Sequence, residues 1–238
     1  PYEAVTVNTI GAYNICKASM QESVSKVINI STDKAVNPVG VLGATKLLSE
    51  KLISAESFHN KTKTIFSSVR FGNVLQTRGS ILPRIENQIK NGGPITLTDK
   101  KMKRFFMTKN QSVDLILKAA EYAKGGEIFV LKMPLILLSD LFDVMKELIA
   151  PKYRLNSSKI KTKIIGIRPG EKITEYLLTD FELENVLETN DFLIIPSMFD
   201  SSTKKYKNAK KPKNIKNYFE SLKPISKSEI KNMLQDVY

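Results

Sequence analysis

The sequence predicts an α/β protein with a mostly parallel sheet, because short runs of β-branched residues alternate with longer amphipathic segments. A run at 25–32, SKVINIST, precedes a long helical pattern at 43–60, and a second run at 63–74, KTIFSSVRFGNV, precedes a helical pattern at 81–93. The composition is that of a globular protein, with 42% hydrophobic and 26% charged residues in a chain of 238. We therefore expect α/β layering around a largely parallel sheet whose strands are connected by helices.

Further elements follow along the chain. Each expected helix has apolar residues at helical spacing, and each expected strand is a short apolar run bounded by turn-forming residues. The other expected helices are 2–20, 111–126, 138–150 and 168–178, and the other expected strands are 94–99, 127–133, 162–167 and 191–197. Ser139 is the predicted N-cap of the helix at 138–150. We expect residues 1–200 to form one α/β domain and residues 201–238 to form a basic tail.

The net charge of the chain is strongly positive. Lysine and arginine number 37 against 24 aspartates and glutamates, a net charge of +13, and much of the excess lies in the Lys- and Asn-rich segment after Ser201. Such a run is most often a solvated tail, and the alternative is attraction to an anionic partner such as phosphate, nucleic acid or a membrane surface. The sequence has no tryptophan, no zinc-ligand spacing and no aromatic RNA-binding motif, so we expect no nucleic-acid partner.

Cysteine, histidine and hydropathy narrow the class further. Cys16 is the single cysteine, so no intrachain disulfide is available, and we expect a cytoplasmic protein in a reducing compartment. No apolar run reaches the roughly 18–20 residues that span a bilayer, so we expect no transmembrane segment. His59 is the single histidine and stands apart from other metal-ligating residues, so we expect no metal site.

Polar side chains gather where the first predicted strand ends. Thr32, Asp33 and Lys34 follow the apolar part of the run at 25–32, and the sequence RFGN at 70–73 closes the second run. Ligands of parallel sheets bind at the carboxyl ends of the strands, so both groups are expected to face one crevice.

This polar group has a chemical and a structural interpretation. An aspartate can act as a general acid and a desolvated lysine as a general base, while Lys46, which shares a helix face with Leu42, could hold a ribose or fix a positive field beside an oxidised nicotinamide. The alternative is a loop closed by an ion pair between Asp33 and Lys34 with Thr32 as its cap, because such pairs are common in proteins.

Several longer stretches carry a more specific signal. NPVGVLGATKLLSEKL, SSVRFGNVLQTRGSILP, PITLTDKKMKRFFMT, GGEIFVLKMP and GIRPGEKITEYL resemble the extended short-chain dehydrogenase/reductase superfamily, within it the sugar-nucleotide dehydratases and epimerases of polysaccharide biosynthesis, and most closely the inverting UDP-N-acetylglucosamine 4,6-dehydratases. The resemblance spans residues 1–197. It implies a Rossmann-like doubly wound sheet with a smaller C-terminal substrate-binding part, a bound NAD or NADP, a UDP-sugar substrate and a homo-oligomer.

The resemblance also implies roles for single residues. In that family carbon 4 of the sugar is oxidised by hydride transfer to the cofactor, water is lost across carbons 5 and 6, and the hydride returns to carbon 6. Thr32 would contact the carbon 4 hydroxyl, Asp33 would protonate the leaving carbon 6 hydroxyl, and Lys34 would exchange the carbon 5 proton, with Lys46 as the fourth catalytic residue. The cofactor-binding residues would be Asn8, Ser31, Lys46, Arg70 and Gly72, and the substrate-binding residues Asn73, Arg78, Arg104, Arg168 and Glu171.

Two features depart from the family pattern. Leu42 stands at the tyrosine position of the Tyr-x-x-x-Lys pair and cannot carry a proton, so Thr32, Asp33 or Lys34 is expected to supply the base at carbon 4. The chain also contains no Gly-x-x-Gly-x-x-Gly phosphate loop, so we expect it to lack the N-terminal strands of the Rossmann sheet and to be inactive alone.

Three functions remain open at this point. The first is a 4,6-dehydratase, the second is a UDP-sugar 4-epimerase of the same fold, and the third is a non-catalytic relative that binds sugar nucleotides. Asp33 and Lys34 favour the dehydratase, because an epimerase needs no acid at carbon 6. Leu42 and the basic tail favour the third function.

Overall fold

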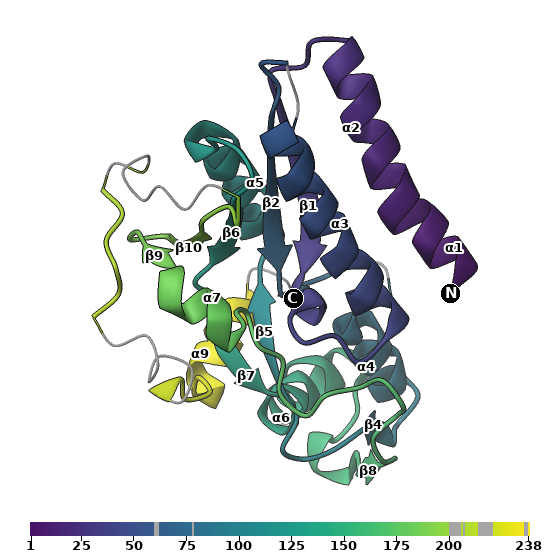
Figure 1. The fold of residues 1–238 in the computed structure, drawn as a ribbon. Coiled ribbons are helices and arrows are strands. Elements are labelled where there is room, and N and C mark those ends of the chain that lie inside the picture. The colour runs from purple at the N-terminus through teal and green to yellow at the C-terminus, as the bar shows by residue number, and fades with distance from the viewer. Residues whose placement is uncertain (60–61, 78, 200–205, 207, 214–220, 236–237) are drawn as a thin grey trace. The chain divides into compact units, whose positions relative to one another are not determined.

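The computed structural model describes residues 1–59, 62–77, 79–199, 206, 208–213, 221–235 and 238 (Figure 1). The chain divides into two units, each with its own sheet and helices. Unit 1 comprises Pro1–Phe71, Asn110–Lys132 and Tyr176–Ser221, and unit 2 comprises Gly72–Lys109, Met133–Glu175 and Leu222–Tyr238. The end of the chain is thus part of unit 2, whereas the sequence suggested one domain over residues 1–200 and a separate tail.

The sheet of unit 1 has the strand order β1-β2-β6-β10-β9. Its strands are β1 (Lys26–Thr32), β2 (Ile65–Phe71), β6 (Ile128–Leu131), β9 (Leu187–Glu188) and β10 (Phe192–Ile195). β1, β2 and β6 are parallel, as predicted from their alternation with helices, and β10 and β9 add an antiparallel edge. In register, Ser31 lies opposite Arg70 and Thr32 opposite Phe71, so β1 and β2 end at the same edge of the sheet.

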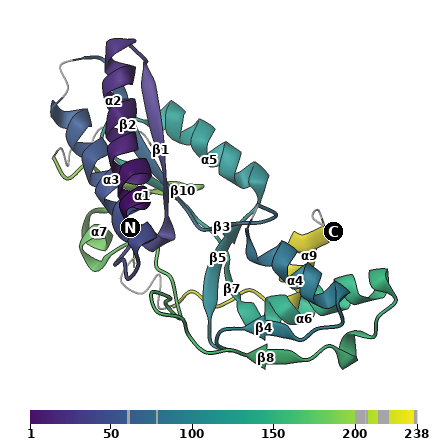
Figure 2. The same cartoon turned by 90° about the vertical axis from the view of Figure 1, so that its right-hand side faces the viewer.

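Helices cover both faces of the parallel strands in unit 1. Figure 2 shows α2 and α3 on one face of β1 and β2 and α5 on the other, which confirms the doubly wound α/β class. The helices are α1 (Tyr2–Val5), a π-helical turn (Thr6–Ile10), α2 (Gly11–Gln21), α3 (Val41–His59), α5 (Lys109–Tyr122) and α7 (Asp180–Asn185). Cys16 of α2, Ile53 of α3 and Phe66 of β2 form a buried cluster that attaches both helices to the sheet.

The described part of unit 2 contains short strands in two small sheets, together with three α-helices. Its strands are β3 (Asn73–Val74), β4 (Ile95–Leu97), β5 (Lys103–Met107), β7 (Leu135–Leu137) and β8 (Thr162–Ile164), and its helices are α4 (Ile81–Lys90), α6 (Leu138–Ile149) and α9 (Lys227–Gln235). The strands pair as β3-β5-β7 and as β4-β8. The 3₁₀ turns Ala150–Tyr153 and Ser157–Lys159 follow α6. Apolar faces of the three helices share one core, which includes Ile89, Phe142 and Leu234.

Two predictions of local structure in unit 2 are wrong. The segment 171–178 is not helical, because its backbone pairs with β5 instead: Thr174 bridges Lys103, and the Lys103 amide donates to the carbonyl of Ile173. Ser139 lies inside α6 rather than at its N-cap, which is Leu137. In both places long-range contacts decide the backbone, and a local sequence pattern does not contain them.

The end of the chain is not merely a solvated tail. Residues 227–235 form α9, and Ile230 and Leu234 are buried in the core of unit 2 against α6. Lys227 donates to Asp143 at 2.7 Å. The interpretation of 201–238 as a solvated tail is therefore wrong for α9, because its apolar residues recur at helical spacing within a lysine-rich background.

Among the described residues, no helix is long and apolar enough to cross a membrane. α3 is the longest, and it buries the polar side chains of Thr45, Ser49 and Glu50 in its length.

Candidate functional site

A hydrogen-bonded turn follows the last residue of β1. The chain passes from Thr32 directly into a 3₁₀ turn, Asp33–Ala35, and the Thr32 Oγ1 caps this turn by accepting a hydrogen bond from the Lys34 amide at 3.4 Å. Asp33 Oδ1 accepts hydrogen bonds from Thr32 Oγ1 and from Lys34 Nζ, each at 2.9 Å. We call these three residues the aspartate turn. Its geometry fits both interpretations of the sequence, a proton-transfer group and a loop closed by an ion pair.

Two buried polar atoms of this region have no hydrogen-bond partner among the described residues. Asp33 is fully buried, and its second carboxylate oxygen, Oδ2, has no partner there. The buried hydroxyl of Ser31 is likewise without a partner in this part of the chain. Leaving such an atom unsatisfied costs about 1–3 kcal/mol, which a ligand with complementary groups would recover. The aspartate turn is therefore a candidate binding site, and the catalytic roles of its residues stay predictions.

Lys46 lies on α3 and reaches back to the strand that carries the turn. Its Nζ donates to the carbonyl of Ile30 at 3.0 Å. Burial lowers the pKa of the Lys46 ammonium, and the nearby Glu50 carboxylate partly offsets this effect. An ammonium held beside the ends of parallel strands is suited to a ribose hydroxyl, so the unpartnered Ser31 hydroxyl and Lys46 together fit a dinucleotide cofactor.

Leu42 lies one helical turn before Lys46 on α3, and Asn8 of the neighbouring π-helical turn contacts α3 next to Lys46. The Asn8 amide, in the π-helical turn, donates to Thr45 Oγ1 at 3.0 Å, next in sequence to Lys46. Thr45 Oγ1 lies 3.1 Å from the Leu42 carbonyl, to which it can donate. The Leu42 side chain is 51% exposed and carries no titratable group. Asn8 is thus attached to the helix that carries Lys46, one residue from the ammonium-bearing position.

Gly43 is a site residue that the sequence analysis missed. A Cβ at this position would lie 2.1 Å from the carbonyl oxygen of Lys34 and 3.0 Å from Pro38 Cβ. The first turn of α3 therefore packs directly on the backbone of the aspartate turn, and no side chain fits between them. A glycine inside a helical pattern was the available signal, since glycine there is unfavourable without a packing reason.

Arg70 has a structural role in place of the expected cofactor contact. Its five N–H groups donate to both oxygens of Glu50, both oxygens of Glu182 and the carbonyl of Leu177, at 2.7–3.0 Å. Arg70 and Glu50 are completely buried, so the guanidinium has no donor left for a cofactor. The prediction that this side chain binds the cofactor is therefore withdrawn. We call Glu50, Arg70 and Glu182 the arginine cluster.

The charges of the arginine cluster stabilise one another. Burial alone would lower the pKa of Arg70, but the carboxylates of Glu50 and Glu182 raise it overall. Burial likewise opposes ionisation of Glu182, and the hydrogen bond and charge of Arg70 hold its pKa below the ordinary value. Glu182 also completes a capping box with Thr179 at the start of α7. The cluster thus connects β2, α3 and α7 through fully paired charges.

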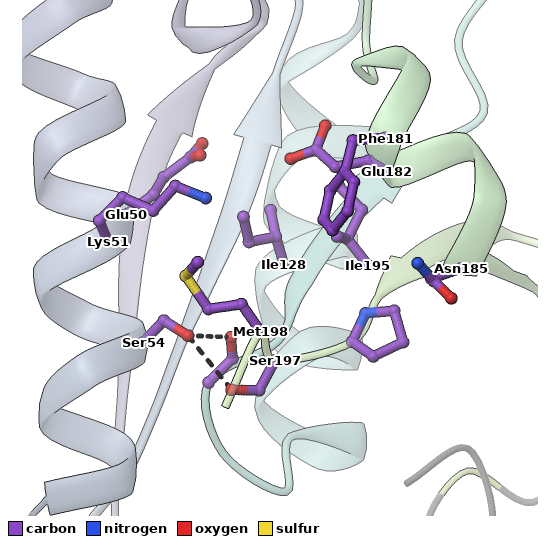
Figure 3. Close-up of a pocket in the computed structure, with 12 residues that line it drawn as sticks. Glu50, Lys51, Ser54, Ile128, Phe181, Glu182, Asn185, Ile195, Ser197 and Met198 are labelled. Carbon is purple, nitrogen blue, oxygen red and sulfur yellow. Dashed lines mark hydrogen bonds between the residues drawn. The ribbon is translucent and has the colours of Figure 1, made fainter. Parts of the chain in front are cut away.

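A cavity of about 320 Å³ borders the arginine cluster. Figure 3 shows Glu50 and Lys51 of α3 on one side of it and Phe181 and Glu182 of α7 on the other. The Ser54 hydroxyl donates to the carbonyl of Gly126 at 3.0 Å and lies 3.3 Å from the Ser197 hydroxyl. None of the described site residues predicted from the sequence lines this cavity, so it is separate from the aspartate turn.

In unit 2, Gly72, Asn73 and Arg104 are engaged with β5. A Cβ on Gly72 would lie 2.8 Å from the Phe105 carbonyl, so this glycine has a packing reason of its own. Asn73 donates to the same carbonyl at 3.0 Å. The Arg104 guanidinium is nearly buried and donates to the carbonyls of Lys103, Lys172 and Ile173, which holds the 172–173 segment against β5. Contacts of these residues with cofactor or substrate stay predictions.

Arg168 and Glu171, two further predicted substrate residues, lie in or next to an exposed turn. The Arg168 amide lies 3.4 Å from the Glu171 carboxylate, and the Glu171 amide donates back to the Arg168 carbonyl at 3.1 Å. Arg168 is exposed, so its guanidinium is accessible to a ligand. Arg78 lies outside the described residues. The expected catalytic residues thus all belong to unit 1. Those expected substrate-binding residues that the structure describes belong to unit 2.

Known proteins with similar sequences indicate the family. The family model for "Polysaccharide biosynthesis protein" matches residues 1–197. A Methanocaldococcus jannaschii protein described as an uncharacterized membrane protein is 50% identical over 100% of this chain and 69% of its own length. The capsular polysaccharide biosynthesis protein CapD of Staphylococcus aureus is 45% identical over 77% of this chain and 30% of CapD. The UDP-glucose 4-epimerase of Rickettsia canadensis is 38% identical over 82% of this chain and 56% of the epimerase.

Solved structures agree with the family assignment. The X-ray structure of Pen from Bacillus thuringiensis superposes with a TM-score of 0.88 at 42% identity, covering 99% of this chain and 69% of Pen. DesIV of Streptomyces venezuelae, a dTDP-glucose 4,6-dehydratase solved with NAD bound, shares the fold at 16% identity, with a TM-score of 0.62 over 76% of this chain and 59% of DesIV. The chain therefore belongs to the polysaccharide biosynthesis protein family, and it has the fold of the NAD-bound enzyme DesIV.

Proposed function

We propose that the full-length gene product that contains this chain is an NAD(P)-dependent 4,6-dehydratase of UDP-N-acetylglucosamine in polysaccharide biosynthesis. The observation that carries the proposal is the aspartate turn, in which the buried Asp33 pairs with Lys34 through Oδ1 while Oδ2 has no partner among the described residues. Elimination of water needs an acid and a base side by side, and this turn offers both on consecutive residues.

The oxidation step fits the hydrogen bond between Thr32 and Asp33. NAD or NADP, when bound, supplies the hydride acceptor for carbon 4 and the hydride donor for carbon 6. Thr32 Oγ1 receives the proton of the carbon 4 hydroxyl and passes its own proton to Asp33 Oδ1, to which it already donates at 2.9 Å. This route needs no tyrosine, which accounts for Leu42 at that position. Lys46 holds the nicotinamide ribose, with Ser31 and Asn8 beside it.

The elimination step follows from the same proton. Lys34, which is 37% exposed, first gives its ammonium proton to solvent. Its amine then removes the carbon 5 proton, and the electrons of that C–H bond form the double bond between carbons 5 and 6. The C–O bond at carbon 6 breaks with its electron pair, and Asp33 delivers its proton to the leaving oxygen. Lysine is then an ammonium and aspartate a carboxylate, the two partners of the 2.9 Å ion pair. Lys34 returns its proton to carbon 5 when carbon 6 is reduced.

A UDP-sugar 4-epimerase is the second candidate. The 38% identity to the UDP-glucose 4-epimerase of Rickettsia canadensis favours it. An epimerase removes and returns hydride at carbon 4 and leaves carbons 5 and 6 unchanged. Under this alternative Thr32 keeps its role, whereas the acid and base functions of Asp33 and Lys34 have no step to serve.

Mass spectrometry of UDP-N-acetylglucosamine incubated with the full-length gene product and NAD or NADP tests the proposal. We expect a product that has lost one water. A product of unchanged mass that separates as a new isomer would establish the epimerase. An unchanged substrate under all conditions would support a non-catalytic sugar-nucleotide-binding protein.

A further inference from the structure

We infer that Gly43 is a positioning residue for the aspartate turn, an inference that rests on the proposed function of that turn. Its missing side chain lets the first turn of α3 lie directly against the Lys34 backbone. The contact between Gly43 and the Lys34 backbone thus determines how closely α3 approaches the turn.

The atoms that a side chain at position 43 would meet first belong to the backbone of Lys34. A Cβ at position 43 would lie 2.1 Å from the Lys34 carbonyl oxygen and 3.0 Å from the Lys34 carbonyl carbon. A flexible side chain could move away, but this carbonyl belongs to the 3₁₀ turn Asp33–Ala35, whose Asp33 and Ala35 are buried. Ordinary contact would require the carbonyl and α3 to separate by roughly 1 Å.

Moving α3 away from the aspartate turn would displace the reacting groups that each of them carries. The turn carries the carboxylate of Asp33 and the amine of Lys34, and α3 carries Lys46, whose Nζ is bound to the Ile30 carbonyl. A shift of α3 would pull Lys46 away from β1, and a shift of the turn would reorient Asp33. Misplacement of reacting groups by about 1 Å can cost about a hundredfold in rate.

A matched pair of helical glycines gives the test. Gly43→Ala is compared with Gly11→Ala in α2, where the new Cβ would meet only the Thr6 carbonyl, at an ordinary 3.4 Å. For Gly43→Ala we expect kcat to fall about a hundredfold with KM within about threefold of the wild type, and for Gly11→Ala we expect both to stay within about twofold. Equal turnover of the two variants would overturn the inference.

A structural readout separates this inference from the proposed function. A crystal structure of Gly43→Ala should show the Lys34 carbonyl displaced from α3, whether or not the wild type turns over any sugar nucleotide. An undisplaced carbonyl would overturn the inference even if the dehydratase activity is established. Absence of wild-type turnover with the displacement present would leave the packing role standing and remove the proposed function.

A second variant covers the case in which Gly43→Ala does not fold. Ala35→Gly adds no atom and loosens the same turn from within, since Ala35 is its last residue and is buried. We expect kcat to fall about tenfold with an unchanged KM and a folded protein. An unchanged kcat in this variant would contradict the claim that the position of the turn limits turnover.

Discussion

Unit 1 contains two buried polar clusters on neighbouring strands, and they differ in how completely their hydrogen bonds are satisfied. In the arginine cluster all five N–H groups of Arg70 are bound, and both carboxylates of its partners are paired through both oxygens. In the aspartate turn the Asp33 Oδ2 and the adjacent Ser31 hydroxyl have no partner among the described residues. Ser31, next to the aspartate turn, pairs with Arg70 on the neighbouring strand, so the two clusters are adjacent in the sheet.

How completely its hydrogen bonds are satisfied indicates whether a buried polar cluster is suited to hold the fold together or to bind a ligand. A saturated buried cluster holds elements together and has nothing to offer a ligand, whereas a partly satisfied cluster persists at a cost that a ligand can recover. Residue type alone does not distinguish the two clusters, since both contain carboxylates paired with a basic side chain. Saturated hydrogen bonds thus fit a structural role for Arg70, and the unpartnered oxygen of Asp33 fits the catalytic role proposed for it.

The largest expected effect is on folding, from Arg70→Met. This change leaves the Glu50 and Glu182 carboxylates buried without their partner, and breaking one side of a buried charge cluster typically costs about 3–5 kcal/mol. Urea unfolding followed by circular dichroism measures the loss. A loss below about 1 kcal/mol would mean that these carboxylates find other partners, and the scaffold assignment would fail.

Asp33→Asn should act mainly on turnover. The change keeps the shape and removes the acid, so we expect a fall in kcat of about 10²–10⁴. Lys34 is 37% exposed, so the lost ion pair should change the free energy of unfolding by only about 1 kcal/mol or less. Steady-state kinetics and urea unfolding on the same preparation check both values. A large loss of stability with little loss of turnover would reverse the comparison between the clusters.

The acid stability of the protein should depend on Glu182. Its folded pKa lies below the ordinary value, because the hydrogen bond and charge of Arg70 outweigh burial. The folded state therefore binds this proton less tightly than the unfolded state, so the stabilisation is complete above the unfolded pKa and is lost as the pH falls through the folded pKa. Unfolding free energies measured from neutral to acidic pH should fall less steeply for Glu182→Gln. Identical acid limbs would contradict the assignment.

The smallest effects on stability and binding are expected from replacing two serines that differ in whether their hydroxyl is hydrogen-bonded. Ser68 accepts a hydrogen bond from Asn29 at 3.1 Å, whereas the Ser31 hydroxyl has no partner in the described part of the chain. Ser68→Ala should destabilise the fold by about 1 kcal/mol, and Ser31→Ala should leave it unchanged or slightly more stable. Ser31→Ala should instead weaken cofactor binding by the full-length gene product about tenfold or less, measured by calorimetry. Equal stability losses in both variants would show that Ser31 is bonded within the protein.

Local patterns predicted most of the fold. The alternation of apolar runs and amphipathic segments predicted β1, β2 and β6 as parallel strands and α3 and α5 as helices. The expected helix at 168–178 failed because Arg104 and Lys103 capture the carbonyls of Lys172 and Ile173, about 70 residues away in sequence, and no local pattern records such a contact.

The candidate site was predictable where its residues are consecutive. Thr32, Asp33 and Lys34 form one group because they share a turn, and the helical spacing placed Lys46 on the element that follows. The role of Arg70 could not be predicted, because its partner Glu182 is 112 residues away and becomes a neighbour only after folding. Gly43 was signalled as a glycine within a helical pattern, but the backbone carbonyl of Lys34 that it packs against could not be read from the sequence.

The absorbance of reduced cofactor in Lys34→Met tests the central claim most directly. If the aspartate turn performs elimination, this variant can still oxidise carbon 4 through Thr32 and Asp33 but cannot remove the carbon 5 proton, so mixing it with UDP-N-acetylglucosamine should produce a lasting near-ultraviolet band of reduced nicotinamide. Lys46→Ala should suppress that band, because ribose binding precedes hydride transfer. A dehydrated product formed by Lys34→Met at the wild-type rate, without the band, would contradict the account.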